Sequence, residues 1–565
     1  MSGSTNDLLQ LAQWVVSKGG FCSENLSFSI DDKSGSTAHA SSLINASESN
    51  PLPILSCPLS LVIDFEKAAT YIWGTSSACP IKSDPVIAVR IYLCLQRLEG
   101  ENAEYFPYIK TLPSLFGTPI FFTANELDLL RGTNLYGDVE QRRAKWITEH
   151  SEILPHIPDT FDKSRLTSEL YLWACTVLTS RSFPSKIVFN TAAEEEDSSY
   201  PVLIPLVDSL NHYPRTPVVW NVDPSSFALA AATTIEEGRE IFNNYGPKGN
   251  EELLMGYGFC LPDNEFDLVS LKLRLPNLTP DQIAILQTSP DTENSGIFYL
   301  TLAHPLPDSL VRLFCVNVAN EAELEHMKSN TETDSLRCKL DALMNLSIAI
   351  SRKLSGHRLP ELRDESSSTE RNIYLYISGQ VRILSACAAA IYRQILDSIA
   401  PRSSASFSFE NEKLRQIIKA ELPSCGLHLE TLAADARFSQ FFNAVKSVHS
   451  DFLTSEMDEL YLSVFIAHLA ILSYSSDKAS PYREWIESMR TRYDDKEEPD
   501  ADAADQLEYM DDILQNLAEV CPEVFAGDAW SQTLLAWAMK VVGSEAVYFH
   551  YEERSEPMLV VITGK

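Results

Sequence analysis

The sequence lacks closely spaced cysteines. Its 11 cysteines are scattered singly through 565 residues, and no two are separated by only one or two residues. Clustered metal ligands and a dense disulfide framework are therefore not expected, and this cysteine usage fits a reducing compartment. We expect a chain that binds no metal and lies in the cytoplasm, with the nucleus as a further compartment.

Long apolar runs and an excess of basic residues are absent too. No run approaches the ~20 apolar residues that span a bilayer, and no basic region precedes the short apolar stretch at the N-terminus, so neither a membrane span nor a secretory signal is expected. The formal net charge is −33. Such a field repels nucleic acid and anionic membranes and attracts basic partners. The serine-hydrolase motif G-x-S-x-G is missing as well, which argues against that enzyme class.

The two halves of the sequence differ in their residue patterns. Residues 1–275 mix helical patterns with short runs that are rich in β-branched or aromatic residues and bounded by turn residues. Three of these runs are predicted strands, at 218–222, 227–235 and 239–245. Residues 276–565 carry mostly amphipathic helical patterns, and the run at 461–472 is apolar all round, which is typical of a buried helix. The sequence therefore predicts an α+β protein whose second half is mainly α-helical.

One glycine-rich stretch carries bulky rings at fixed points. Residues 238–259 read GREIFNNYGPKGNEELLMGYGF. Taken alone, a tyrosine and glycine hairpin with core aromatics is the simpler interpretation. Two further segments precede it, TSRSF at 179–183 and PLVDSLNHYP at 205–214, and GFCLPDNEFD continues it at 258–267.

In this order and spacing the segments resemble the SET-domain protein-lysine methyltransferases. The similarity is to the zinc-free, split-SET branch typified by the Rubisco large-subunit methyltransferase and by the fungal ribosomal-protein and elongation-factor lysine methyltransferases. The resemblance implies a SET domain at 1–275 with a threaded segment at 239–259. It also implies a helical insert at about 85–200, C-terminal SET motifs at 200–267 and a helical substrate-binding-like domain at 276–565.

The resemblance also implies a function. The chain is expected to be an S-adenosylmethionine-dependent protein-lysine N-methyltransferase that acts as a monomer and without a metal. Its substrate would be a basic non-histone protein: a ribosomal protein, a translation elongation factor or a cytochrome c-like protein. Nucleic acid and membrane are not expected partners. Two alternatives stay open, a protein-histidine methyltransferase and a catalytically inactive SET-fold binding module.

Individual residues receive roles from the same resemblance. Tyr245 would be the catalytic residue, with its phenol beside the sulfonium and the target amine. The cofactor would be bound by Arg181, Asn211, His212, Tyr245, Phe259, Gly35 and Ala38. The substrate lysine would be bound by Ser180, Phe183, Asp208 and Tyr257.

The chemistry of these side chains suits such roles. The guanidinium fork of Arg181 is suited to a carboxylate, whereas the phenyl ring of Phe183 cannot hydrogen-bond an imidazole and so favours a lysine substrate. For Asp208, a hydrogen-bonded loop carboxylate is an equally good interpretation, and His212 taken alone is typical of a structural histidine. Gly246, Gly256 and Gly258 would let the backbone turn tightly around the cofactor.

The N-terminal cofactor loop departs from the family pattern. The nearest match to its glycine motif is GSTAHA at 35–40, where Thr37 stands in the place of the second glycine. A Cβ atom there restricts positive φ. Either the loop takes another route or the match is displaced along the sequence.

Overall fold

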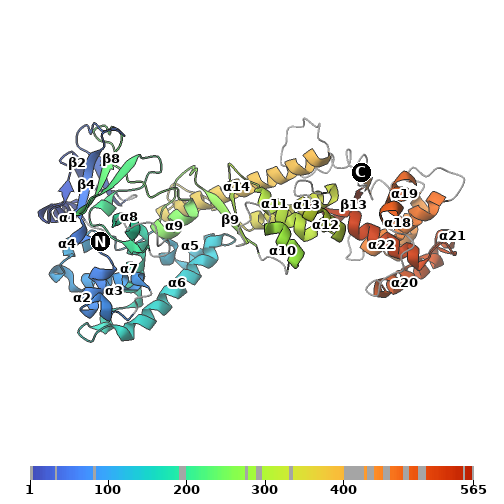
Figure 1. Cartoon of the computed structure of the whole chain (residues 1–565), viewed down its shortest axis with the longest axis horizontal. Coiled ribbons are helices and arrows are strands. Elements are labelled where there is room, and N and C mark those ends of the chain that lie inside the picture. Colours follow the sequence, from blue (N-terminus) through green and yellow to red (C-terminus); the bar gives the residue numbers. More distant parts are fainter. Residues whose placement is uncertain are drawn as a thin grey trace. The chain divides into compact units, whose positions relative to one another are not determined.

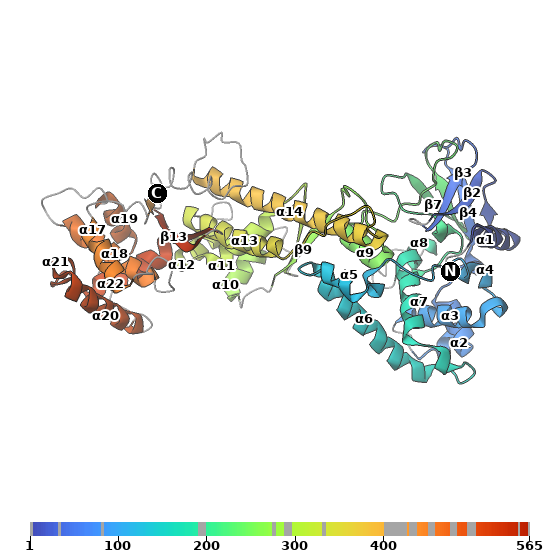
Figure 2. The ribbon, with the colours of Figure 1, turned by 180° about the vertical axis from the view of Figure 1, so that it is seen from behind.

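The computed structural model describes most of the chain. The described residues are 4–31, 35–80, 84–189, 199–273, 278–287, 296–329, 335–399, 426–428, 438–449, 458–474, 483–493, 504–551 and 554–562. The chain divides into two compact units (Figures 1 and 2), of which the first comprises Met1–Val269 and Ser355–Arg382 and the second comprises Ser270–Leu354 and Ile383–Lys565. The expected domain boundary at residue 275 lies outside the described residues.

Short strands form the β-core of the first unit. They are β1 (Phe21–Cys22), β2 (Leu26–Asp31), β3 (Gly35–Ala40), β4 (Leu52–Pro58), β5 (Phe183–Pro184), β6 (Pro201–Val202), β7 (Val218–Val222) and β8 (Ser226–Ala231). Four of them make an antiparallel sheet in the order β1-β4-β8-β7, while β2 pairs with β3 and β5 with β6. Ile54, Leu55 and Cys57 of β4 are buried and anchor the sheet in the core.

The third predicted strand, at 239–245, is wrong. β7 matches the strand expected at 218–222, and β8 covers part of the one expected at 227–235. The segment at 239–245 instead makes isolated bridges, antiparallel between His39 and Glu240 and parallel between His212 and Asn243. Because its neighbour changes within a few residues, no continuous ladder forms. Asn243 consequently lies against the loop that carries His212.

Helices α2–α8 occupy the sequence between β4 and β7. The helices of the first unit before α14 are α1 (Thr5–Ser17), α2 (Phe65–Trp73), α3 (Pro85–Glu99), α4 (Phe106–Ile109), α5 (Ala124–Leu129), α6 (Asn134–Ile153), α7 (Ser168–Arg181), α8 (Ser185–Val188) and α9 (Asn250–Tyr257). Side-chain caps start several of them, as at Asp64 before α2, Thr123 before α5 and Thr167 before α7. Helix α7 (Figure 1) ends at Arg181, so the SRSF motif at 180–183 runs from the last two residues of α7 through Ser182 to Phe183 in β5.

The first unit also includes a segment from the second half of the sequence. Helix α14 (Ser368–Ile399) begins there, and its Tyr376 hydroxyl donates to Oε2 of Glu251 in α9 (2.8 Å). The Asn372 Oδ1 atom accepts from the Cys260 backbone N–H (3.1 Å). The assignment of 276–565 to one domain does not anticipate this return, because hydrophobic patterning indicates which face of a helix is buried but not what covers it.

Helix α14 is also long and apolar enough, by length and composition, to cross a membrane. A core helix of a soluble protein has the same properties, and 44% of the apolar window of α14 is buried inside the structure. Ile373, Tyr376 and Ile377 from its first half belong to the core of the first unit.

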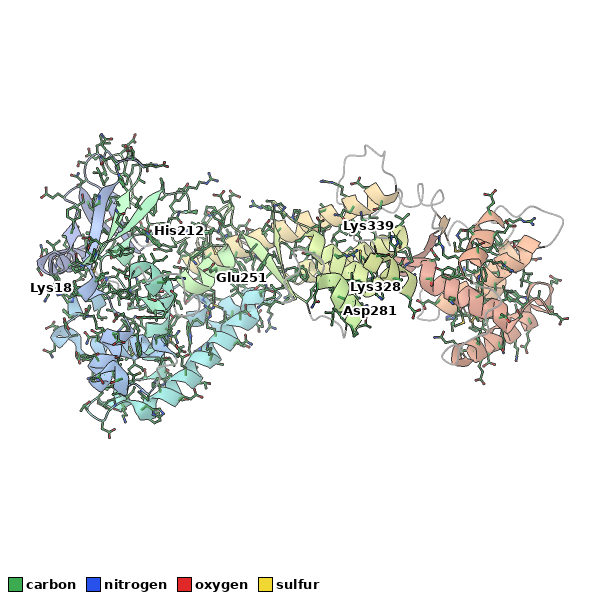
Figure 3. The ribbon with its side chains drawn as sticks, viewed as in Figure 1. Lys18, His212, Glu251, Asp281, Lys328 and Lys339 are labelled. Atoms are coloured by element: carbon green, nitrogen blue, oxygen red, sulfur yellow. The ribbon has the colours of Figure 1, made fainter. Side chains whose placement is uncertain are left out.

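The second unit is mainly helical. Its helices besides the second half of α14 are α10 (Pro280–Gln287), α11 (Asp308–Val318), α12 (Glu321–Ser329), α13 (Leu336–Ser355), α17 (Ser439–Val448), α18 (Asp458–Tyr474), α19 (Arg483–Arg492), α20 (Ala504–Val520), α21 (Pro522–Phe525) and α22 (Gln532–Glu545). Its strands are β9 (Leu268–Lys272, which begins in the first unit), β10 (Ile297–Thr301), β11 (Gly426–His428), β12 (Ala546–Tyr551) and β13 (Arg554–Ile562). The apolar run at 461–472 lies in α18, where each residue from 461 to 470 is buried, so the prediction of a buried helix is confirmed. On the surface, Lys328 of α12 pairs with Asp281 of α10 (2.9 Å; Figure 3).

Candidate active site

Four aromatic rings gather where the loop after β8 meets α9 in the first unit. The rings of Tyr245 and Tyr257 stack with centroids 5.1 Å apart, and the His212 imidazole stacks on Tyr245 at 4.9 Å. The Phe259 ring contacts Tyr257 edge-on at 6.2 Å and lies 6.5 Å from His212. Figure 3 labels His212 in this unit. The two tyrosines of the glycine-rich stretch are therefore partners in one cluster.

Tyr245 is held at both its backbone and its side chain. Its backbone N–H donates to Nδ1 of His212 (3.0 Å), and its hydroxyl donates to the Leu210 carbonyl (2.7 Å). Because Nδ1 accepts, the neutral His212 ring carries its proton on Nε2. The Nε2 atom is buried and has no hydrogen-bond partner among the described residues. His212 thus orients Tyr245 while keeping one donor unused.

A pocket of about 650 Å³ lies against this cluster. Tyr245 and Tyr257 line it together with Ser180, Arg181, Phe183 and Asp208. All six are predicted from the sequence to bind the cofactor or the substrate. Its other lining residues are Ser182, Pro184, Ile187, Ser199, Tyr200, Pro201, Val218, Trp220, Asn243, Asn244, Gly246 and Lys248. The pocket therefore combines an aromatic wall with a few charged and polar groups, which is the usual composition of a small-ligand site.

Asp208 and Arg181 interact with each other inside the pocket. Asp208 lies in the 3-10 turn η8 (Val207–Ser209), just after Leu206, whose φ of 75° is unusual for a non-glycine residue. The Arg181 Nη1 atom donates to the Asp208 carbonyl (2.9 Å) and lies 3.7 Å from its Oδ2, which accepts from the Tyr108 hydroxyl (2.6 Å). The guanidinium assigned to a cofactor carboxylate is therefore already bound to the protein through one of its nitrogens.

Burial raises the pKa of the Asp208 carboxyl, although Arg181 and the Tyr108 hydroxyl both act to lower it. Its Oδ1 atom is buried and has no hydrogen-bond partner among the described residues. One carboxylate oxygen of Asp208 is thus hydrogen-bonded within the protein, and the other is available to a ligand. The predicted role of Asp208 in binding the substrate lysine stays a prediction.

Two of the residues predicted to bind the substrate lysine, Ser180 and Phe183, lie at the end of α7 and in the following strand β5. Phe183 packs edge-on against Trp220 and Phe227, at 5.5 Å in each case, and is almost completely buried. The Ser180 hydroxyl donates to the Thr176 carbonyl within the helix (2.7 Å). Both residues line the pocket, Phe183 as a rigid apolar wall and Ser180 as part of its polar rim.

Asn211, Gly35 and Ala38 do not line this pocket. The Asn211 side-chain amide donates to Glu240 (2.9 Å), and the Asn211 backbone carbonyl accepts from the Asn243 N–H (2.8 Å). Ala38 is buried in β3, and its carbonyl accepts from the Ile241 N–H (2.7 Å), which places β3 alongside the segment that leads to Tyr245. Gly35 begins that strand with a φ of +71°. Their assigned roles toward the cofactor stay predictions.

Thr37 needs no positive φ. It lies within β3, pairs with Ser29 and is buried, so the departure from the family's glycine is accommodated by an extended strand. Its hydroxyl hydrogen-bonds the Ser29 hydroxyl (2.7 Å). A hydrogen-bonded pair of hydroxyl side chains therefore lies where a second glycine was expected.

The three glycines differ in what they do. Gly246 and Gly258 have positive φ values of 98° and 85°. Gly256 has no positive φ, and it lies inside α9 with open space around a built Cβ atom. The prediction that all three allow tight turns is therefore wrong for Gly256, because a helix can accommodate any small side chain at that position.

Comparisons with known proteins show which proteins the chain is similar to. No protein-family model matches the chain. The ribosomal lysine N-methyltransferase set10 of Schizosaccharomyces pombe is 33% identical over 352 residues (59% of this chain, 62% of the relative), and the ribosomal lysine N-methyltransferase 1 of Saccharomyces cerevisiae is 28% identical over 348 residues (50% and 58%). The actin-histidine N-methyltransferase of Drosophila melanogaster is 27% identical over 204 residues (32% and 37%).

The solved structures agree on the fold. The SET domain of LSMT bound to MeLysine and AdoHcy matches with a TM-score of 0.57 at 18% identity, covering 70% of this chain and 94% of that chain. The chain therefore has the SET fold of the Rubisco large-subunit methyltransferase structures, and its sequence is similar to the two ribosomal lysine N-methyltransferases. The predicted α+β fold class is thereby confirmed. The matched regions span about three fifths of the first two curated relatives, 62% and 58% of their lengths.

The residues of this SET-domain protein fit the cofactor that the resemblance implies. The Nε2 atom of His212 and the Oδ1 atom of Asp208 are buried and have no hydrogen-bond partner among the described residues, and such atoms normally have a partner. Asp208 lines the pocket, so a polar ligand there would supply a partner for its Oδ1 atom. Among the described residues, no group of three or more His, Cys, Asp and Glu side chains could hold a metal ion.

Sequence reasoning missed three side chains of this SET-domain site. Trp220 lines the pocket, and its indole N–H donates to Asn243 (3.1 Å); it stood in a predicted strand without a functional signal. Tyr108, which donates to Asp208, stood within the expected helical insert at about 85–200, outside the motifs that carry the resemblance. Lys248 stood in the glycine-rich stretch itself, beside Gly249, and reads there as an ordinary turn residue.

Acid is expected to lower the free energy of unfolding by protonating His212. Burial lowers the pKa of His212 to about 4, so folding favours the neutral ring. That contribution to stability is complete above the unfolded pKa of about 6.5 and is lost as the pH falls toward about 4. We expect wild-type protein to lose about 3 kcal/mol over this window through His212. His212→Asn, whose Oδ1 can still accept the Tyr245 N–H, should lack this loss. Urea unfolding across the window measures it.

The control for this prediction is His156→Asn. His156 is exposed, so its replacement should leave the acid slope unchanged. An equal slope in wild-type protein and in His212→Asn would show that His212 does not titrate with folding.

Proposed function

We propose that the chain is an S-adenosylmethionine-dependent protein-lysine N-methyltransferase. The observation that carries the proposal is the pocket that Tyr245, Tyr257, Phe183 and Asp208 line together beside Arg181. The names of the curated relatives set10 and ribosomal lysine N-methyltransferase 1 support the same activity. When bound, the cofactor would supply a methyl group on a positively charged sulfur, for which alignment of an uncharged amine is the main requirement.

The target amine must first lose its proton. A lysine in water has a pKa of ~10.4, so presenting the neutral amine near pH 7 costs about 4–5 kcal/mol. Stacked Tyr245 and Tyr257 rings with the Phe183 ring make a wall that desolvates the ammonium and lowers this cost. The chain's net charge of −33 acts in the opposite direction, although water and salt screen its distant parts.

Tyr245 acts here as a hydrogen-bonding group and not as a base. Burial raises the pKa of its phenol well above the usual range, so the hydroxyl keeps its proton at neutral pH. It can therefore orient polar groups at the reaction centre by donating its O–H, as it does to the Leu210 carbonyl. Arg181, Asn211, His212 and Phe259 would hold the cofactor on the adjoining side of Tyr245.

The substrate class we propose is a basic non-histone protein, with ribosomal proteins first and elongation factors second. The acidic charge of the chain favours encounter with basic proteins. The word "ribosomal" in the names of the first two relatives supports the same class. A lysine substrate is further supported by Phe183, whose ring packs on Trp220 and offers an imidazole no hydrogen bond.

Two measurements test the proposed function. Calorimetry with S-adenosylmethionine should show saturable heat, and incubation with labelled cofactor and lysate from a methyltransferase-deficient fungus should label a discrete basic protein on lysine. Lysate without the enzyme is the control. Absence of heat and of label would favour the inactive binding module, and fragmentation that places the methyl on histidine would favour the histidine methyltransferase.

A further inference from the structure

Lys248 places a positive charge in the pocket, and no role in binding or catalysis has been assigned to this residue so far. It lines the same pocket as Tyr245 and Tyr257, and its side chain is only 20% exposed. Its Nζ atom lies 5.7 Å from the centre of the Tyr257 ring, within the range of a cation–π contact. A charged group thus sits beside the tyrosine that is predicted to bind the substrate lysine.

This cation is fixed at both ends. Its carbonyl accepts from the Asn264 side-chain amide (2.8 Å), and its ammonium forms an ion pair with Glu252, one helical turn further along in α9. Burial is the largest single effect and acts to lower the pKa of Lys248, but the combined hydrogen bonds and charges of Glu252 and Tyr257 outweigh it and raise that pKa. Lys248 is therefore charged at neutral pH and held in place.

Other titratable and charged groups face the pocket from several elements. Those that line it are Arg181 from α7, Asp208 from η8, Tyr200 and Tyr245 from loops, and Tyr257 from α9. Glu252 of α9 pairs with Lys248 and His212 stacks on Tyr245, but neither of them lines the pocket. The Glu252 side chain is 57% exposed, so water screens the part of its charge that acts beyond its ion pair with Lys248. The positive charge of Lys248 also acts to lower the pKa of His212, after the larger effect of burial. Its field therefore reaches a neighbouring titratable group.

Resting on the proposed lysine methyltransferase function, we propose that Lys248 supplies a fixed positive charge that favours the uncharged form of the target amine. A like charge destabilises an ammonium but leaves an amine unaffected, so it lowers the pKa of the amine. The effect is strongest where water is excluded, whereas the acidic surface acts mainly through solvent with a screening length of about 8–10 Å. Lys248 thereby opposes, locally, the tendency of the acidic chain to keep a lysine protonated.

The test measures the pKa of a bound amine directly. The probe is free ε-N-methyl-lysine with an isotopically labelled methyl group, titrated by NMR while bound to the full chain with S-adenosylhomocysteine. We expect Lys248→Met to raise the pKa of the bound amine by about 0.5–1 unit. Lys248→Arg should keep the wild-type value, and Glu252→Gln should lower it, because the opposing carboxylate is gone. The opposite signs at 248 and 252 separate a charge effect from a general disturbance of α9.

The matched control is Lys163→Met. Lys163 also forms an i,i+4 ion pair, with Asp159 at 2.6 Å, but it lies outside the pocket, so the pKa of the bound amine should not change. If the probe binds and its pKa is the same in wild-type protein, Lys248→Met and Glu252→Gln, the role of Lys248 is refuted while the proposed function stands. If the probe does not bind wild-type protein saturably, the proposed lysine substrate fails and this inference fails with it.

Discussion

Replacing Tyr245 with phenylalanine is expected to reduce methyl transfer about 100-fold, the size of effect seen when one hydrogen-bonding group is removed from a reaction centre. The substitution keeps the ring, and therefore the stacking on His212 at 4.9 Å and on Tyr257 at 5.1 Å. It removes only the hydroxyl that donates to the Leu210 carbonyl. Affinity for S-adenosylhomocysteine, measured by calorimetry, should change by less than about threefold, because ring contacts and shape persist.

Tyr213→Phe is the matched control for Tyr245→Phe. Tyr213 lies two positions after Asn211, is 46% exposed and does not line the pocket, so its hydroxyl should be dispensable for transfer. Unchanged turnover in Tyr245→Phe would remove the phenol from the mechanism. A parallel loss of cofactor affinity would instead indicate that the hydroxyl supports the shape of the site.

Replacing Gly258 with alanine is expected to lower the free energy of unfolding by about 3–5 kcal/mol, because two costs coincide there. Its φ is +85°, which disfavours a residue with a Cβ atom. That Cβ would also lie 2.8 Å from the carbonyl carbon of Gly117 and 2.9 Å from the Thr118 nitrogen, where only backbone could move away. Since Gly258 stands between Tyr257 and Phe259, the displacement should also disturb the aromatic cluster.

Gly74→Ala is the matched control for this stability prediction. Gly74 has the same φ of +85°, but a Cβ atom there would meet nothing within 4 Å. We expect it to cost only about 1 kcal/mol, the conformational part of the penalty. Urea unfolding of both variants separates the two costs. Equal losses in the two variants would show that the close approach of Gly117 and Gly258 contributes nothing to stability.

Much of the candidate site could be predicted from the sequence because its side chains are grouped in short motifs. Arg181 is the last residue of α7, Phe183 follows two positions later in β5, and both line the pocket. Tyr245 and Tyr257 stand at the two ends of one segment and meet as a stacked pair. In motifs of this kind a helix end or a turn sets the relative positions of the side chains, so the sequence alone indicates which side chains lie together.

Other features could not be predicted, because they depend on partners distant in sequence. The prediction of a strand at 239–245 is wrong, since the segment runs past His39 and His212 in turn and never keeps one neighbour. Tyr108 reaches Asp208 from the helical insert, 100 positions earlier. No period or propensity in a single chain specifies such pairings.

By itself, the amino-acid sequence determined the α+β class, the SET-type motifs and the buried helix at 461–472, because periodicity, composition and short motifs are local properties. Only the tertiary structure decided that Lys248 shares a pocket with Tyr245 and that Tyr376 of α14 binds Glu251 of α9. The physical reason is that packing and electrostatic interactions depend on distances in space. The sequence specifies the chemical groups, and folding sets the distances at which they interact.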